Sequence, residues 1–140
     1  MMSIAVIYWS QTGNTEAMAN AIFEGAKSAG KEVELFNVAD IDAAKALEFD
    51  VLALGCPSMG VEVLEEAEFE PFMESIESGL AGKKVVLFGS YGWGDGQWMR
   101  DWEERVKEAK AELVNGEGYI VNETPEEDAI AELKELGASL

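Results

Sequence analysis

A polar loop near the start of the chain has the composition of an anion-binding site. It contains Ser10, Gln11, Thr12, Gly13, Asn14 and Thr15, between an apolar run at 4–9 and a helical pattern over 14–29. The first turn of a helix presents backbone N–H groups without intrahelical partners and carries partial positive charge. Hydroxyl and amide side chains add donors, and a glycine permits close approach or a positive φ. Because the loop contains no Lys or Arg, it predicts a phosphate held by neutral dipoles.

The same loop lacks the groups that would cleave a phosphate. It has no Gly-Lys-Ser/Thr sequence of the nucleotide hydrolases, and no Cys nucleophile followed by Arg. The alternative interpretation is an ordinary helix start capped by Thr12 or Asn14. Three hydroxyls, two side-chain amides and a glycine in six positions exceed what capping requires. The loop therefore predicts phosphate binding without hydrolysis.

Composition excludes several classes of partner and site. The chain has 140 residues, with 28 acidic and 10 basic side chains and a formal net charge of −18. This charge argues against nucleic acids and anionic membranes as partners. The lack of histidine removes the commonest metal ligand, and a single cysteine excludes an internal disulfide. No signal peptide or membrane-spanning run is evident, so we expect a cytoplasmic monomer with one domain over 1–140.

Apolar runs alternate with helical patterns along the chain. Strands are expected at 4–9, 33–36, 49–55, 83–89 and 113–121, the last bulged at Asn115-Gly116. Helices are expected over 14–29, 69–80 and 98–109 and from Pro125 onward, with a short turn at 41–46. The alternation predicts an α/β fold: a doubly wound, five-stranded parallel sheet of order 2-1-3-4-5, with helices on both faces. Ligands of such sheets bind beyond the carboxyl ends of the strands.

Two further loops are expected at the same edge of the sheet. The loop after the third strand contributes Pro57, Ser58, Met59, Gly60, Val61 and Glu62. The loop after the fourth strand contributes Ser90, Tyr91, Gly92, Trp93 and Gly94. An indole among glycines indicates a planar ligand stacked on Trp93, with the Met59 thioether closing the other face. Taken singly, Trp93 could also pack the loop against the body of the protein, and a methionine in a loop more often does so.

Together these motifs resemble those of flavodoxins of the short-chain kind. The resemblance rests on Ser10–Thr15 after Tyr8-Trp9, on Gly55–Pro57 with Met59-Gly60, and on 87–94. Flavodoxin is itself the type example of the 2-1-3-4-5 order with FMN at the switch point. The resemblance implies that 10–15 hold the FMN phosphate and that Met59 and Trp93 flank the isoalloxazine. It also places the Gly92 and Trp93 amides at the pyrimidine edge, Glu62 as acceptor from a ring nitrogen, and Asn122 near the ribityl or ring edge.

The implied function is electron carriage without catalysis. By the resemblance, a tightly bound, non-covalent FMN cycles between semiquinone and hydroquinone at low potential. The Gly60-Val61 peptide would face flavin N5, and we expect Gly60 to take any positive φ because Val61 is β-branched. Seven glutamates and no Lys or Arg lie between Glu62 and Glu77. They suit docking to redox partners with basic surfaces, meaning oxidoreductases and ferredoxin-type partners.

Three other functions remain as alternatives. An FMN-dependent NAD(P)H or quinone reductase of the same fold would need an open ring face, which Trp93 would cover. A phosphoacceptor signalling domain would need clustered aspartates after the first strand and a Lys after the fifth, and 8–10 and 121–123 supply neither. A cofactor-free adaptor would lack flavin absorbance. Flavin colour and redox titration distinguish these functions from the carrier.

Overall fold

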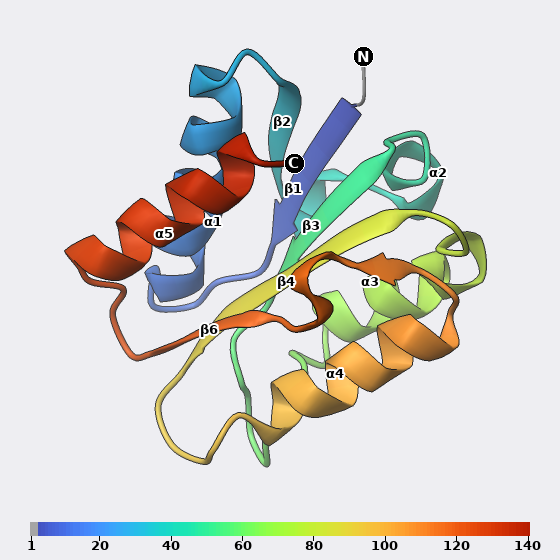
Figure 1. Ribbon diagram of the computed structural model, residues 1–140. Helices are drawn as coiled ribbons and strands as arrows, with labels where there is room; N and C mark the ends of the chain where they lie inside the picture. Colours follow the sequence, from blue (N-terminus) through green and yellow to red (C-terminus); the bar gives the residue numbers. More distant parts are fainter. Residues whose placement is uncertain (1–2) are drawn as a thin grey trace.

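The computed structural model describes residues 3–140, and Met1 and Met2 lie outside them. Its parallel strands are β1 (Ser3–Tyr8), β2 (Glu32–Asn37), β3 (Val51–Gly55), β4 (Lys84–Tyr91), β5 (Glu112–Leu113) and β6 (Tyr119–Asn122). They form one sheet of order β2-β1-β3-β4-β5, with β6 also paired to β4 (Figure 1). The predicted parallel order is confirmed.

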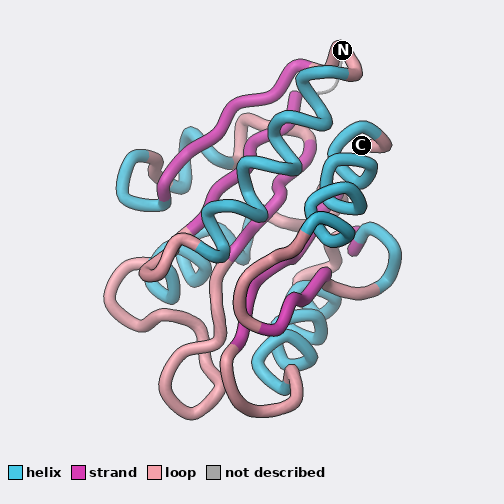
Figure 2. The backbone as a smooth tube through the Cα atoms, turned by 90° about the vertical axis from the view of Figure 1, so that its left-hand side faces the viewer, coloured by secondary structure: helices cyan, strands magenta, loops and turns pink. Residues whose placement is uncertain are grey.

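Helices cover both faces of this sheet. The helices α1 (Asn14–Ser28) and α5 (Glu127–Ala138) lie on one face. The helices α2 (Ala43–Ala46), α3 (Phe69–Ile76) and α4 (Gln97–Glu108) lie on the other. Figure 2 shows the longer connecting loops gathered at one end of the strands. None of the helices within residues 3–140 is both long enough and apolar enough to cross a bilayer.

The central strand β3 is apolar throughout because helices cover both of its faces. All five of its residues are buried. Val51 and Ala53 face the cluster formed with α1 and α5, whereas Leu52 and Leu54 face the cluster formed with α3 and α4. Since successive side chains of a strand point to opposite faces, a strand covered on both sides needs apolar residues at every position.

The prediction of one bulged fifth strand is wrong. The segment forms two short strands separated by a 3-10 turn at Val114–Gly116. Asn115 and Gly116 both have positive φ, 65° and 74°, so the chain turns out of the sheet. β5 pairs with Lys84 and Val85, and β6 returns to pair with 88–91 further along β4.

Element ends differ from the predictions by a few residues. Gly30 follows α1 with φ 79° and its N–H donates to Lys27 O, as expected of a C-terminal glycine. The third strand begins at Val51, and α3 ends at Ile76 before a 3-10 turn at Glu77–Gly79. The last helix begins at Glu127, two residues after the buried Pro125.

Helices α1 and α5 approach each other through two glycines. A Cβ at Gly25 would lie 1.9 Å from Lys134 O, and one at Gly137 would lie 2.1 Å from Ile22 O. Both obstacles are backbone atoms of the facing helix. The two helices therefore pack backbone against backbone, as an unsubstituted Cα permits.

We expect one pH-dependent contribution to stability from Tyr119. Its hydroxyl donates to Glu132 Oε2 at 2.6 Å, and burial together with this bond raises the pKa of Tyr119 to about 12. An unfolded tyrosine ionises near pH ~10. The contribution is thus complete below that pH and is lost as the pH rises to about 12. Urea midpoints should fall less between neutral and alkaline pH in Tyr119→Phe than in the parent, and equal slopes would contradict the assignment.

Candidate functional site

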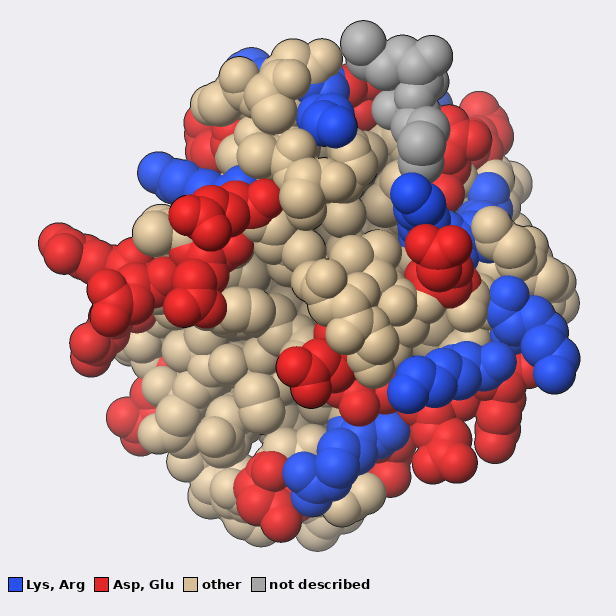
Figure 3. Space-filling model, viewed as in Figure 1, with Lys and Arg blue, Asp and Glu red and all other residues tan. Residues whose placement is uncertain are grey.

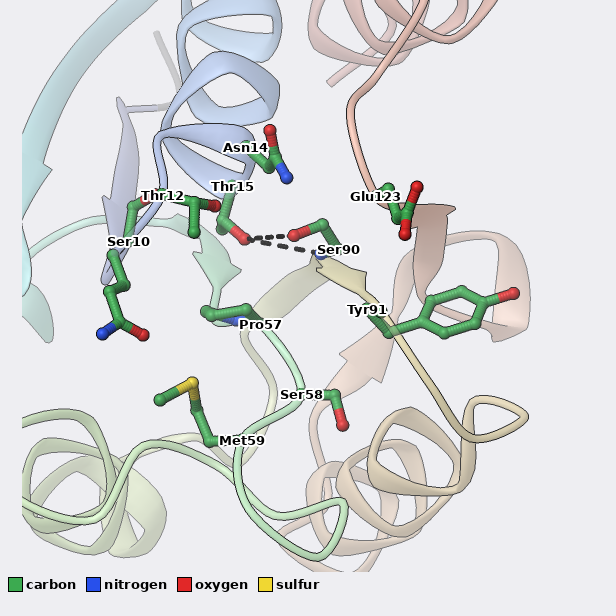
Figure 4. A pocket seen from close by; sticks show the side chains of 12 residues that line it. Ser10, Thr12, Asn14, Thr15, Pro57, Ser58, Met59, Ser90, Tyr91 and Glu123 are labelled. Carbon is green, nitrogen blue, oxygen red and sulfur yellow. Dashed lines mark hydrogen bonds between the residues drawn. The ribbon is translucent and has the colours of Figure 1, made fainter.

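A pocket of about 200 Å³ opens at the carboxyl edge of the sheet, as the strand order predicts. The first loop lines it with Ser10, Gln11, Thr12, Asn14 and Thr15. The loop after β3 lines it with Pro57, Ser58 and Met59, and the end of β4 and the next residue line it with Ser90, Tyr91 and Gly92. Figure 4 shows Thr12, Asn14 and Thr15 on one side of the pocket and Ser58 and Met59 on the opposite side.

Gly13 and Ser10 shape the first loop. Gly13 is the N-cap residue of α1 and has φ 95°, while a Cβ there would meet no atom within 4 Å. The glycine is therefore required by its backbone angle and not by lack of space. Ser10 Oγ accepts hydrogen bonds from the N–H groups of Gly13 at 3.1 Å and Glu16 at 3.3 Å. Neither Thr12 nor Asn14 caps the helix, so the simple capping interpretation is wrong.

Several donors of this loop remain available to a ligand. Within the described chain, no residue accepts from the backbone N–H of Thr12, Asn14 or Thr15. These groups lie at the positive end of α1, where an anion is favoured. The Ser10 hydroxyl proton is also uncommitted, because its oxygen serves as the acceptor in both of its bonds. The loop thus presents neutral donors without a cation, as the sequence predicts.

Thr15 joins the first loop to the end of β4. Its side chain is buried, and its Oγ1 lies 3.3 Å from Ser90 Oγ and accepts from the Ser90 N–H at 3.4 Å (Figure 4). The Ser58 N–H in turn donates to Ser90 O at 3.0 Å. Ser90 is therefore the point at which all three loops meet.

The loop after β3 forms a tight hairpin from Met59 to Val63, which we call the 59–63 hairpin. Each end donates its N–H to the carbonyl of the other at 2.9 Å. Gly60 has φ 53°, as expected, but Glu62 also has positive φ, 56°. Val61 avoids that region and is 80% exposed. The hairpin therefore carries the apolar side chain of Val61 at the open surface.

The loop after β4 carries Trp93 outward. The indole is 66% exposed, so it does not pin this loop to the core. Asn122 Nδ2 donates to Tyr91 O at 3.2 Å and to Gly92 O at 3.4 Å, and the Glu123 N–H donates to Tyr91 O at 2.7 Å. The end of β6 thus supports the backbone that leads to Trp93.

Glu62 ties the 59–63 hairpin to helix α4. Its Oε1 accepts from the N–H groups of Gly96 at 3.2 Å and Gln97 at 3.1 Å, at the positive end of that helix. A Cβ at Gly94 would lie 2.5 Å from the Glu62 carboxylate, so the glycine makes room for it. One carboxylate therefore fixes the loop after β3 against the loop after β4.

Removing this tie should lower stability. We expect Glu62→Ala to cost about 1 kcal/mol of unfolding free energy, the usual worth of a helix N-cap acceptor. Glu62→Gln should cost less, because the amide oxygen still accepts. Urea unfolding of the apoprotein measures this without any contribution from a ligand. Glu66→Ala, an exposed neighbour, is the control; equal effects of Glu62→Ala and Glu66→Ala would contradict the assignment.

Some predicted site residues lie outside the pocket lining, and one lining residue was missed. The residues that do not line it are Gly13, Gly60, Val61, Glu62, Trp93, Gly94 and Asn122. Gly13 shapes the first loop, Gly60, Val61 and Glu62 belong to the 59–63 hairpin, Trp93 and Gly94 belong to the loop after β4, and Asn122 hydrogen-bonds to the backbone before Trp93. Glu123 does line it, to the right of Asn14 in Figure 4. Its position just after the last strand is the signal that would have included it, since that edge carries the ligand.

The acidic segment after the hairpin is more fully paired than the sequence suggests. Arg105 of α4 bonds to both carboxylate oxygens of Glu70, at 2.9 and 2.6 Å, and forms an ion pair with Glu77. Glu65 is partly desolvated, but hydrogen bonds from the N–H groups of Phe69, Glu68 and Ala67 hold its pKa below the usual value. The segment is thus negatively charged, but Arg105 and backbone N–H groups already compensate some of its carboxylates.

Cys56 begins the loop after β3 but does not present its thiol to the pocket. The side chain is fully buried, and burial raises the pKa of the thiol well above its ordinary value. Its Sγ accepts from the Glu65 N–H at 3.4 Å, and its carbonyl accepts from Trp98 Nε1 at 3.1 Å. Cys56 therefore has a structural role between β3, α3 and α4.

The donor set fits a flavin with a phosphate tail. Free N–H groups and hydroxyls at a helix N-terminus match a phosphate monoester. Beyond them, Met59 and the exposed Trp93 offer polarizable and aromatic surface to a planar ring. Thr15, Ser58 and Ser90 hold the three loops together at the base of this site.

A doubly wound sheet with a phosphate-binding turn after its first strand is the architecture of FMN-binding electron carriers. The family model for flavodoxin matches residues 6–137, and the chain belongs to the flavodoxin family. Flavodoxins bind FMN and exchange electrons with redox partner proteins, so this chain is an FMN-binding electron-transfer protein.

Individual relatives agree with the family assignment. A flavodoxin of Clostridium beijerinckii is 55% identical over 120 residues, covering 86% of this chain and 81% of the relative. A flavodoxin of Megasphaera elsdenii is 47% identical over 134 residues, covering 96% and 95%. The solution structure of the two-electron-reduced Megasphaera elsdenii flavodoxin superimposes with a TM-score of 0.87, covering 98% of this chain and 99% of that one at 45% identity.

Proposed function

We propose that the protein is a low-potential one-electron carrier whose tightly bound, non-covalent FMN cycles between semiquinone and hydroquinone. The observation that supports this most is the pocket itself. Its three loops supply neutral hydrogen-bond donors and side chains that can shield a flavin ring from water. None of its lining residues is His, Lys or Arg. Such a site holds and insulates a flavin, which supplies the electron chemistry when bound.

In this proposal Ser10, Thr12 and the N–H groups of Asn14 and Thr15 hold the phosphate. Met59 and Trp93 exclude water from the two faces of the ring, and the Gly92 and Trp93 amides orient its pyrimidine edge. The Gly60 carbonyl accepts from N5 when that atom carries a proton. Open space around Gly60 supports this role, because the peptide can rotate there without a Cβ clash.

Carboxylates near the ring are proposed to lower the second potential. A unit charge at about 10 Å contributes ~0.4 kcal/mol in water-like dielectric and ~1.7 kcal/mol at an effective value of about 20. These energies correspond to roughly 20 to 70 mV for one electron. Arg105 pairs with Glu70 and Glu77, so those two carboxylates contribute less than the sequence alone would suggest. The acidic side chains of this segment that form no ion pair carry the effect.

The acidic surface is proposed to dock redox partners that carry basic patches. Figure 3 shows acidic side chains projecting over the start of α5, where Glu126, Glu127 and Asp128 lie. Cations gather instead over the C-terminal half of α4. Ionic steering of this kind raises encounter rates and weakens with salt. We also propose that residues 1–140 form one domain that works as a cytoplasmic monomer, since a charge of −18 opposes self-association.

Redox titration of the FMN-loaded protein, followed by absorbance, tests the proposal. Two separated one-electron midpoints, with the second well below the first, are the expected result. A single two-electron midpoint together with steady NAD(P)H oxidation by the purified protein would instead indicate a reductase. An apoprotein that binds no FMN would exclude both functions.

A further inference from the structure

Met59 is the one methionine in the described part of the chain whose side chain is not buried. Met18 and Met73 are fully buried and Met99 is 2% exposed, whereas Met59 is partly exposed and lines the pocket at the carboxyl edge of the sheet. In the view of Figure 4 its side chain extends from the loop after β3 toward Pro57. A small solute that enters the pocket therefore reaches this thioether, while the core covers the other three.

The cysteine of the same loop does not compete for an oxidant. Cys56 is fully buried, and burial raises the pKa of its thiol well above the ordinary value. Oxidants attack the cysteine thiolate, so a buried thiol that stays protonated is protected. The thioether of Met59 needs no ionisation, and its access to the oxidant decides how fast it reacts.

Hydrogen peroxide is the oxidant that suits a thioether in a narrow pocket. The sulfur of Met59 attacks one peroxide oxygen, the O–O bond breaks, and a methionine sulfoxide and one water molecule are formed. The sulfur loses two electrons and the peroxide gains them. The product is polar and chiral, whereas the original side chain is apolar, polarizable and suited to a flat ring.

We propose that Met59 is a reversible oxidation site that controls whether the empty pocket can take up FMN. The sulfoxide places a polar oxygen where the ring needs an apolar surface, and covering such a group without a donor costs binding free energy. Methionine sulfoxide reductases reverse the step: two thiols become a disulfide, the oxygen leaves as water, and the thioether returns. The effect on FMN uptake rests on the proposed function, in which Met59 covers one ring face, whereas the oxidation itself does not.

The backbone at Met59 is held in place, so the oxidised side chain cannot leave the pocket with its loop. The Met59 N–H donates to Val63 O and the Met59 carbonyl accepts from the Val63 N–H, both at 2.9 Å. The preceding Ser58 N–H donates to Ser90 O at 3.0 Å. The competing outcome is that rotation about the side-chain bonds alone turns the sulfoxide toward water and leaves the ring site open. The two outcomes differ in FMN affinity.

Peroxide treatment of the apoprotein, followed by peptide mass spectrometry and FMN titration, distinguishes them. We expect the peptide with Met59 to gain one oxygen more than about tenfold faster than those with Met18, Met73 and Met99, which react only when the core opens. The Kd for FMN should rise roughly 5- to 150-fold, the range for one polar group covered without a partner. Reductases for both sulfoxide epimers should restore the original Kd, and bound FMN should slow the oxidation of Met59.

Two leucine variants control for sulfur elsewhere in the chain. Met59→Leu lacks the reactive sulfur, so its own Kd for FMN should be the same before and after peroxide. Met73→Leu removes a buried thioether instead, at similar side-chain volume, and should respond to peroxide as the parent does.

Two results would overturn the proposal. One is a parent Kd that changes by less than about twofold although Met59 is fully oxidised. The other is an equal loss of affinity in Met59→Leu after peroxide. None of these readouts involves flavin reduction. Two normal midpoints with an unchanged Kd would therefore reject the oxidation site alone, and a raised Kd without separated one-electron midpoints would reject only the carrier function.

Discussion

Ser10→Ala is expected to weaken FMN binding by roughly 10- to 150-fold, the equivalent of one hydrogen bond to a charged group at about 1.5–3 kcal/mol. Ser10 Oγ organises the phosphate loop by accepting from the N–H groups of Gly13 and Glu16. Its own proton is then left to donate to the phosphate. Alanine removes both the internal acceptor and the external donor, so the loop loses its shape and one of its contacts together.

Titration of the apoprotein with FMN, followed by flavin fluorescence, measures the loss. Riboflavin, which has the ring but no phosphate, should lose much less affinity, because the change acts at the phosphate end. Ser58→Ala is the matched variant, since Ser58 lines the opposite side of the pocket. Equal losses for FMN and riboflavin, or a Ser10→Ala affinity within about twofold of the parent, would contradict the assigned role.

Gly137→Ala is expected to destabilise the protein by about 2 kcal/mol or more. Alanine is favoured over glycine in a helix interior by about 1 kcal/mol, so propensity alone would predict stabilisation. The new methyl group would lie 2.1 Å from Ile22 O and 3.0 Å from Ala26 N, and both atoms belong to the α1 backbone. Overpacking costs about 1–3 kcal/mol where side chains can adjust, and more where backbones must separate.

Urea unfolding of Gly137→Ala and Gly25→Ala would show this directly. Gly25 meets the facing backbone in the same way, so both variants should lose stability. Because the two sites belong to one helix contact, their effects should not add in the double variant. Glu24→Ala, an exposed change beside Gly25, is the control and should be nearly neutral. A Gly137→Ala protein as stable as the parent would show that α5 moves away from α1 at little cost.

Local patterns and one rule of topology predicted most of this fold. The fully apolar β3 and the alternation of strands and helices indicate a doubly wound sheet, and the carboxyl-edge rule places the ligand loops together. Gly13 could be predicted from its position between a strand and a helix, where a positive φ is common. These features depend on residues close in sequence, or on connections that only one sheet order satisfies.

The features that the sequence did not reveal depend on distant pairs. Glu62 meets the N-terminus of α4 more than thirty residues away, and Arg105 reaches back to Glu70 over a similar distance. No periodicity records such contacts. The break between β5 and β6 was missed because an Asn-Gly pair suits both a bulge and a turn out of the sheet. Only the later pairing of β6 with the end of β4 distinguishes them.

The burial of Cys56 makes the chain convenient for site-specific labelling. It is the only cysteine in the sequence, its side chain is inaccessible, and the raised thiol pKa leaves little reactive thiolate at neutral pH. A cysteine introduced at an exposed position such as Glu66 or Ser28 would therefore be the sole point of attachment for a spin label or dye. Distances from such a probe to the bound cofactor, or to a docked partner, can then be measured on an otherwise native molecule.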